Sequence, residues 1–305
     1  MRLTPSIVRV MLGLLLAGVV SAAEPLLRPA PDAASWRKIF DSMKAPVPPR
    51  HLVGNIYYVG ASGVSSYLIT TPQGHILIDT GFADTVPLIE RSVEQLGFKV
   101  SDIKIILSSH AHVDHTGGHA LMKQLTHAMV CASAADAQVL ESGGADDFIP
   151  GPKSATTYAP VKVDRVIADG ERVTLGDVTL TAHLTPGHTR GATTWTMDAS
   201  DGGRTYHVVF FCSLTINPGV RLVRSPSYPE IVADYESTLK KLRALPCDIF
   251  FAPHGAQFGM ADKFARLDRG DGAAVLVDPA GWHAVLDAGE KAFRDQLAAE
   301  QAASP

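Results

Sequence analysis

Short apolar runs and helix-like patterns alternate along most of the chain. The first runs are bounded by Gly, Pro or Thr and predict strands at residues 55–60, 65–70 and 74–80. Apolar positions with helical spacing follow from Val86 to Leu96 and end at Gly97. The alternation then continues with a strand at 104–109, a helix at 117–125, a strand at 128–133 and a helix at 133–141.

The second half of the chain repeats this order after a long interruption. Residues 142–160 are rich in Gly, Pro and Ser, and a loop of this length in a compact domain tends to be functional. The elements predicted after it are strands at 164–186, 191–197 and 206–214, a helix at 229–244, a strand at 247–255, and helices at 260–269 and 282–300. No change in composition marks a domain boundary, so the pattern predicts one α/β domain with two sheets covered by helices.

The first residues differ from the rest of the chain. Arg2 and Arg9 flank an apolar run, residues 10–20, and Ser21 to Ala23 offer a cleavage site of small residues. This is the pattern of a secretory signal peptide, and the run is too short for a membrane-spanning helix. We therefore expect a signal peptide at residues 1–23, a single domain at 24–305, a periplasmic location and no membrane anchor after cleavage. A Pro-rich lead follows, with a short helix at 36–43, and is expected to lie on the surface of the domain.

The net charge bears on possible partners, and the cysteines bear on a possible disulfide. Loss of the leader removes two arginines and no acidic residue, so the net charge moves from −4 to −6. An acidic chain without a basic stripe is poorly suited to nucleic acid, and none is expected as a partner. Cys131, Cys212 and Cys247 allow one disulfide, whose pairing the sequence leaves open.

The stretch SSHAHVDHTGG carries the most distinctive chemistry. It places His110, His112, Asp114 and His115 between a predicted strand and a Gly pair. Imidazole and carboxylate are zinc ligands, and a catalytic zinc site uses three of them, so two sites need six. His188 in LTPGHTRG and His254 in FFAPHGAQ follow other predicted strands, beside glycines, and complete the set.

The histidines could instead have structural roles at the surface or in the core. A lone His-x-His in a loop is more often a surface or core feature than a metal site, but the longer motif with two further strand-end histidines is far more specific. The remaining seven are interpreted as structural: His51, His75, His119, His127, His183, His207 and His283. Of these, His119 and His183 are close enough in sequence to support the ligands.

With these motifs in view, the chain resembles the metallo-β-lactamase superfamily, and in particular class B β-lactamases of the third subclass. The likeness runs from about Trp36 to the last helix and rests on these segments: GNIYYVGASGVSSYLITTPQGHILIDTG, ILSSHAHVDHTGG, DGERVTLGDVTLTAHLTPGHTRGATTW and YPEIVADYESTLKKLRALPCDIFFAPHG. The resemblance implies an αβ/βα four-layer sandwich with two zinc ions in the groove between the sheets. It also implies a monomer acting on a small-molecule β-lactam.

The resemblance also assigns roles to individual residues. The first zinc would be held by His110, His112 and His188, and the second by Asp114, His115 and His254. Ser213 and Thr215 match family positions that bind the substrate carboxylate. The first two subclasses use a cysteine on the second zinc; here Ser213 matches that position, and Cys212 beside it leaves a cysteine ligand as an alternative. Family members often bond the cysteine of LPC to one near the C-terminus, but residues 255–305 contain none.

The expected reaction is opening of the β-lactam ring of penicillins, cephalosporins and carbapenems by a zinc-bound hydroxide, which Asp114 would orient. A lactone or thioester hydrolase of the same superfamily is the alternative. Those relatives usually carry a metal-bridging Asp where this chain has Cys212 and Ser213, which favours the lactamase. More distant alternatives are a nuclease acting on transfer RNA, disfavoured by the acidic chain, a flavodiiron-type oxidoreductase, which would need Glu in place of His112, and a degenerate metal-binding protein.

Overall fold

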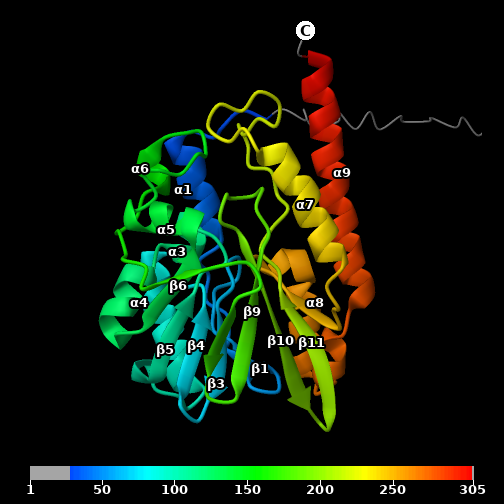
Figure 1. Cartoon of the computed structure of the whole chain (residues 1–305). Coiled ribbons are helices and arrows are strands. Elements are labelled where there is room, and N and C mark those ends of the chain that lie inside the picture. Colours follow the sequence, from blue (N-terminus) through cyan, green and yellow to red (C-terminus); the bar gives the residue numbers. More distant parts are fainter. Residues whose placement is uncertain (1–27, 304–305) are drawn as a thin grey trace, which may run out of the picture.

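Two β-sheets pack face to face, and helices cover the outer side of each (Figure 1). The computed structural model describes residues 28–303, so the expected signal peptide at residues 1–23 lies outside the described residues. The predicted αβ/βα sandwich is confirmed by this arrangement.

The first sheet has seven strands in chain order. They are β1 (Arg50–Val53), β2 (Ile56–Tyr58), β3 (Tyr67–Thr71), β4 (Gly74–Ile78), β5 (Ile103–Leu107), β6 (Met129–Ser133) and β7 (Arg165–Ile167). Strands β1 to β4 pair antiparallel, and β4 to β7 pair parallel. The parallel half needs helical crossovers, which place helices on its outer face.

The second sheet has five strands in the order β12-β11-β10-β9-β8. Their bounds are β8 (Arg172–Leu175), β9 (Val178–Leu184), β10 (Thr193–Asp201), β11 (Arg204–Phe210) and β12 (Ile249–Phe251). All pairs are antiparallel except β11 and β12, which are joined through a long helix and run parallel.

The helices cover the two outer faces and one end of the sandwich (Figure 1). The α-helices are α1 (Ala33–Ser42), α2 (Val86–Gln95), α3 (Val113–Thr116), α4 (His119–Thr126), α5 (Ala134–Glu141), α6 (Lys153–Thr156), α7 (Ile231–Arg243), α8 (Met260–Asp268) and α9 (Pro279–Ala303). Short 3-10 turns are η1 (Ala83–Thr85), η2 (Val100–Asp102), η3 (Gly255–Phe258) and η4 (Ala273–Leu276). Among residues 28–303, no helix is both long and apolar enough to cross a bilayer.

Alternating side chains of the strands divide the core in two. On β3, Leu68 packs with the α2, α4 and α5 side, whereas Tyr67 and Ile69 pack into the space between the sheets. Strand neighbours point to opposite faces, so a strand covered on both sides is apolar throughout. Trp195 of β10 is fully buried between the sheets and donates from Nε1 to the carbonyl of Ser108. The core thus reaches directly to the loop that carries the histidine motif.

Some element boundaries differ from those predicted. The motif loop contains the single helical turn α3, which is too short to leave a periodic signal in the sequence. The long loop 142–160 contains the equally short α6, and strand β1 was not predicted. Strand β11 ends at Phe210, before Cys212 and Ser213, because the ladder with β10 stops there. Cys131, Cys212 and Cys247 are all free thiols.

A buried carboxylate near the end of α9 holds one side of the groove in place. Glu300 is 1% exposed and accepts hydrogen bonds from the backbone N–H groups of Leu222 and Val223 at 2.8–3.1 Å. Gln296 donates both to Glu300 and to the carbonyl of Val220. The segment that follows β11 is therefore fastened to α9 by side chains rather than by a sheet.

We expect Glu300→Ala to lower the free energy of unfolding by about 2–4 kcal/mol, because two buried N–H groups lose their acceptor. Urea unfolding of the metal-free protein measures this. The control is Asp295→Ala on the same helix, which breaks only an exposed ion pair with Lys291 and should cost less than about 0.5 kcal/mol. Equal effects of the two substitutions would contradict the role given to Glu300.

Candidate metal centre

The six candidate ligands all follow the carboxyl ends of strands. His110 to His115 lie in the connection after β5, His188 follows β9, and His254 follows β12. Strand ends from both sheets meet at one edge of the sandwich, where sites in α/β proteins commonly form. Residues far apart in sequence are thereby brought to one place.

The structure gathers these side chains into two clusters of three. His110, His112 and His188 form the first, and Asp114, His115 and His254 form the second; ligand atoms in each cluster lie within 4.8 Å of one another. The clusters adjoin, since the ring centroids of His110 and His115 are 4.3 Å apart.

Several ring nitrogens in the clusters are buried without a hydrogen-bond partner. They are Nε2 of His110 and His115, Nε2 of His112, which faces Asp147, and Nδ1 of His115, which faces Asp79. An unpaired buried polar atom costs about 1–3 kcal/mol, so the unpaired Nε2 atoms of His110 and His115 indicate a ligand that pairs with them. Imidazole nitrogen and carboxylate oxygen are donors that a divalent metal ion such as zinc accepts, and the residues therefore fit metal binding.

Most of the histidines use their second nitrogen to contact the protein. A ligating imidazole commonly bonds the protein through its other nitrogen, which fixes the tautomer and the ring orientation. The contacts are His110 Nδ1 to Ser109 Oγ (3.0 Å), His188 Nδ1 to the Thr215 carbonyl (2.6 Å) and His254 Nδ1 to the Gly63 carbonyl (2.9 Å). Their Nε2 atoms are left for the clusters.

Burial sets the protonation of most of these rings. It lowers the pKa of His112 and His188 to about 3, and that of His110 well below its usual range. Burial alone would raise the pKa of Asp114, but His115 and His254 lower it overall. In turn Asp114, 3.3 Å from His115 Nε2, raises the pKa of His115 against the effect of burial. Neutral imidazoles and an ionised carboxylate are the forms that bind metal ions.

Two further buried carboxylates, Asp79 and Asp136, bond the backbone of the loops that carry the candidate ligands. Asp79, with a positive φ of 58°, accepts from the backbone N–H of Ser109 at 2.8 Å and from its hydroxyl. Asp136 accepts from the N–H groups of Ala111 (3.0 Å) and Gly191 (3.1 Å), and so joins the motif loop to the His188 loop. Burial raises the pKa of Asp79 to about 6 and, together with the charge of Asp147, that of Asp136 to about 7.

A groove of about 370 Å³ lies over both clusters. Ser213 and Thr215 line it, and Ser213 Oγ also accepts the N–H of Thr215 at 3.1 Å. The expected surface arm forms part of the wall: Arg28 and Pro31 line the groove, and the Arg28 carbonyl accepts the N–H of Gly219. Apolar side chains of α1, namely Trp36, Ile39, Phe40 and Met43, line it as well.

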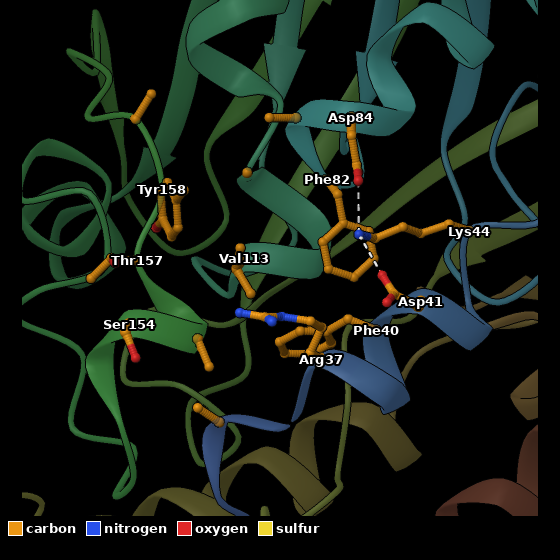
Figure 2. A pocket seen from close by; sticks show the side chains of 15 residues that line it. Arg37, Phe40, Asp41, Lys44, Phe82, Asp84, Val113, Ser154, Thr157 and Tyr158 are labelled. Atoms are coloured by element: carbon orange, nitrogen blue, oxygen red, sulfur yellow. Dashed lines mark hydrogen bonds and ion pairs between the residues drawn. The ribbon is translucent and has the colours of Figure 1, made fainter. Parts of the chain in front are cut away.

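A second pocket lies on the other side of α1 (Figure 2). Phe40 and Val113 line both cavities and separate them. Lys44 there bridges Asp41 and Asp84 at 3.1 and 2.8 Å, as the dashed lines in Figure 2 mark. None of the candidate ligands lines this pocket, so the chemistry belongs to the groove.

The alternative ligand Cys212 and the supporting histidines His119 and His183 lie outside the two clusters. Cys212 belongs to neither cluster; its Sγ lies 3.5 Å from His110 Nδ1, the nitrogen turned away from the first cluster. His119 is buried behind the motif and bonds Thr80 and Ser108, whereas His183 bonds Thr196 and lines a separate pocket. Sequence reasoning did not single out Asp79, Asp136 or Asp147. For Asp147 the available signal was its place in the long Gly- and Pro-rich loop.

Comparisons with known proteins agree with this geometry. Residues 59–254 match the family model of the metallo-beta-lactamase superfamily. The FEZ-1 metallo-beta-lactamase from Legionella gormanii is similar, with 44% identity, a TM-score of 0.83 and coverage of 85% of this chain and 98% of that one. BJP-1 of Bradyrhizobium japonicum, a subclass B3 metallo-beta-lactamase, gives 42% identity, a TM-score of 0.80, and coverage of 86% and 98%.

More distant curated relatives include a hydroxyacylglutathione hydrolase of Rhodospirillum rubrum, 29% identical over 58% of this chain and 56% of that protein. The chain spans about half to two thirds of the length of the first curated relatives that it matches. The family match nevertheless spans strands β3 to β12 and both clusters, and the FEZ-1 structure covers 85% of this chain. The chain therefore belongs to the metallo-β-lactamase superfamily, and its resemblance to the subclass B3 enzymes is confirmed.

Proposed function

We propose that this protein is a zinc-dependent β-lactamase, which hydrolyses the cyclic amide of penicillins, cephalosporins and carbapenems. The observation that carries the proposal is the pair of adjoining clusters on the floor of one groove, with unpaired Nε2 atoms on His110 and His115. The similarity to β-lactamases along nearly their whole length supports it.

The metal ligands of this proposal are the two clusters. His110, His112 and His188 would hold one zinc, and Asp114, His115 and His254 the other. Three protein ligands on each ion leave a position open, as catalytic zinc sites require. When bound, the ions would polarise the amide carbonyl and lower the pKa of water to near neutrality.

Asp114 has the position of an orienting group. Its Oδ2 lies 3.3 Å from His115 Nε2 and 3.7 Å from His254 Nε2, on the wall of the groove. An ionised carboxylate there would accept a hydrogen bond from the attacking water and so hold its lone pair toward the carbonyl carbon. The apolar side chains of α1 would shield the reacting atoms from bulk water.

Recognition of the substrate carboxylate falls to the other side of the groove. Ser213 and Thr215 present hydroxyl donors there, and Arg28 adds a cation. Because the contact between Ser213 Oγ and the N–H of Thr215 uses the oxygen as acceptor, the hydroxyl proton stays available to a carboxylate.

Hydrolysis of a lactone or a thioester is the second candidate, favoured by the likeness to the hydroxyacylglutathione hydrolase. It is disfavoured because the segment after β11 offers Cys212 and Ser213 to the site region and no carboxylate.

We also propose that residues 1–23 are removed on export, that the protein acts in the periplasm without a membrane anchor, and that it is a monomer. The leader pattern of the sequence supports export, and the likeness to the third subclass supports the monomer.

Removal of the metal ions tests the proposed zinc dependence. Hydrolysis of a chromogenic cephalosporin by the purified mature chain should be abolished by a chelator and restored by zinc, because both clusters serve the reaction. His188→Ala should lose at least about 100-fold in kcat/KM, while His283→Ala, on the exposed face of α9, should keep wild-type activity. If the protein binds two metal ions but does not hydrolyse the cephalosporin, the proposal shifts to a lactone or thioester hydrolase. Lactones and thioesters would then be assayed as substrates of the same protein.

Substitution of Asp114 tests its orienting role. Asp114→Asn keeps the shape of the side chain but removes its charge, so kcat should fall at least about 100-fold while KM changes less than about 5-fold. Steady-state kinetics at saturating zinc provides the measurement. Asp262→Asn, an exposed acid on α8, is the matched control. An unchanged kcat in Asp114→Asn would exclude the orienting role.

A further inference from the structure

Asp147 is a buried acid at the metal centre that neither the sequence motif nor the family match assigns. It lies in the middle of the loop 142–160, its side chain is 7% exposed, and it lines the groove. Its Oδ2 is 3.6 Å from Nε2 of His112, a ring that is itself 8% exposed.

His112 lacks the kind of support that the other histidines of its cluster have. His110 and His188 each bond a protein oxygen through Nδ1, whereas Nε2 of His112 makes no hydrogen bond within the described residues. The carboxylate of Asp147 faces this nitrogen. A carboxylate beside the non-ligating nitrogen is a common support for a metal-bound histidine, because it fixes the tautomer and the ring plane.

The loop aims this carboxylate by its own local bonds. Asp147 Oδ1 accepts the N–H of Ile149 at 3.3 Å, its N–H donates to the carbonyl of Gly144 at 3.3 Å, and its carbonyl accepts Lys153 Nζ. The next residue, Phe148, packs edge-on against Tyr228, with ring centroids 4.9 Å apart. Ile149 then lines the groove, so one short segment runs from His112 to the groove wall.

We propose that Asp147 is a positioning residue, which fixes the ring of His112 through Nε2 and makes the order of the groove-wall loop depend on metal in the first cluster. The inference rests on the proposed metal ligands and adds a coupling between metal binding and the substrate groove. It predicts that metal in the first cluster protects the loop against local opening.

The test compares Asp147→Asn with Asp146→Asn, which changes the exposed neighbouring acid of the same loop. Zinc affinity is measured by competition with a chromogenic chelator, and protection of residues 142–160 by hydrogen exchange with and without zinc. Cobalt substitution adds an absorption spectrum that reports the geometry of the ligands in each variant.

In the wild type and Asp146→Asn, zinc should protect the loop. In Asp147→Asn, affinity for the first zinc should fall about 10- to 100-fold, zinc at saturation should no longer protect the loop, and the cobalt spectrum should change. The metal-free Asp147→Asn should keep the stability of the wild type, because the amide oxygen can still accept the N–H of Ile149. A role in folding alone would instead lower that stability and leave zinc affinity unchanged.

Wild-type zinc affinity in Asp147→Asn, or loop protection retained in it, would overturn the inference. So would a wild-type loop that zinc does not protect, although two zinc ions bind. A wild type that binds no zinc would instead overturn the proposed function, so the two failures are distinguishable.

Discussion

Buried imidazole nitrogens without hydrogen-bond partners are the constraint around which this molecule is arranged. At the two clusters, Nε2 of His110 and Nε2 of His115 are in this condition. Each costs free energy, and bringing the rings together adds repulsion whenever one of them is protonated. The two sheets, with an apolar core between them, hold the loops that carry these rings. A metal ion on each cluster would offset the cost by binding one nitrogen of each ring.

The surroundings of the clusters follow from this requirement. A ring that must offer one nitrogen to a metal ion has to be fixed by the other, and hydroxyl, carbonyl and carboxylate groups do this from four different segments. Asp136 adds a connection between segments, since its two oxygens bond the backbone of both the motif loop and the His188 loop. The ligands are thus positioned by main chain that is itself hydrogen-bonded, which leaves little freedom for them to separate.

Much of this could be predicted from the sequence, and the physical reasons for the remainder are specific. Apolar runs placed the strands, and the spacing from His110 to His115 singled out residues that the structure gathers into clusters. Helix α3 could not be predicted because a single turn is too short to show a periodic pattern of apolar residues. Asp79 and Asp136 were missed because their partners lie 30 and 25 residues away in the chain, and no local pattern encodes such a contact. The wall formed by Arg28 and Pro31 was interpreted only as a surface arm for the same reason.

The contacts of Glu300 have a consequence for the order in which the site is completed. A chain that emerges N-terminus first, from a ribosome or through a membrane pore, presents the last histidine of the clusters at residue 254. The segment with Leu222 and Val223 is still unanchored at that stage, because its acceptor lies 78 and 77 residues further on. The candidate metal ligands are therefore all available well before this side of the groove is held in place. Synthesis has to reach the last turns of α9 to complete it, so the clusters and the groove wall are finished at different times.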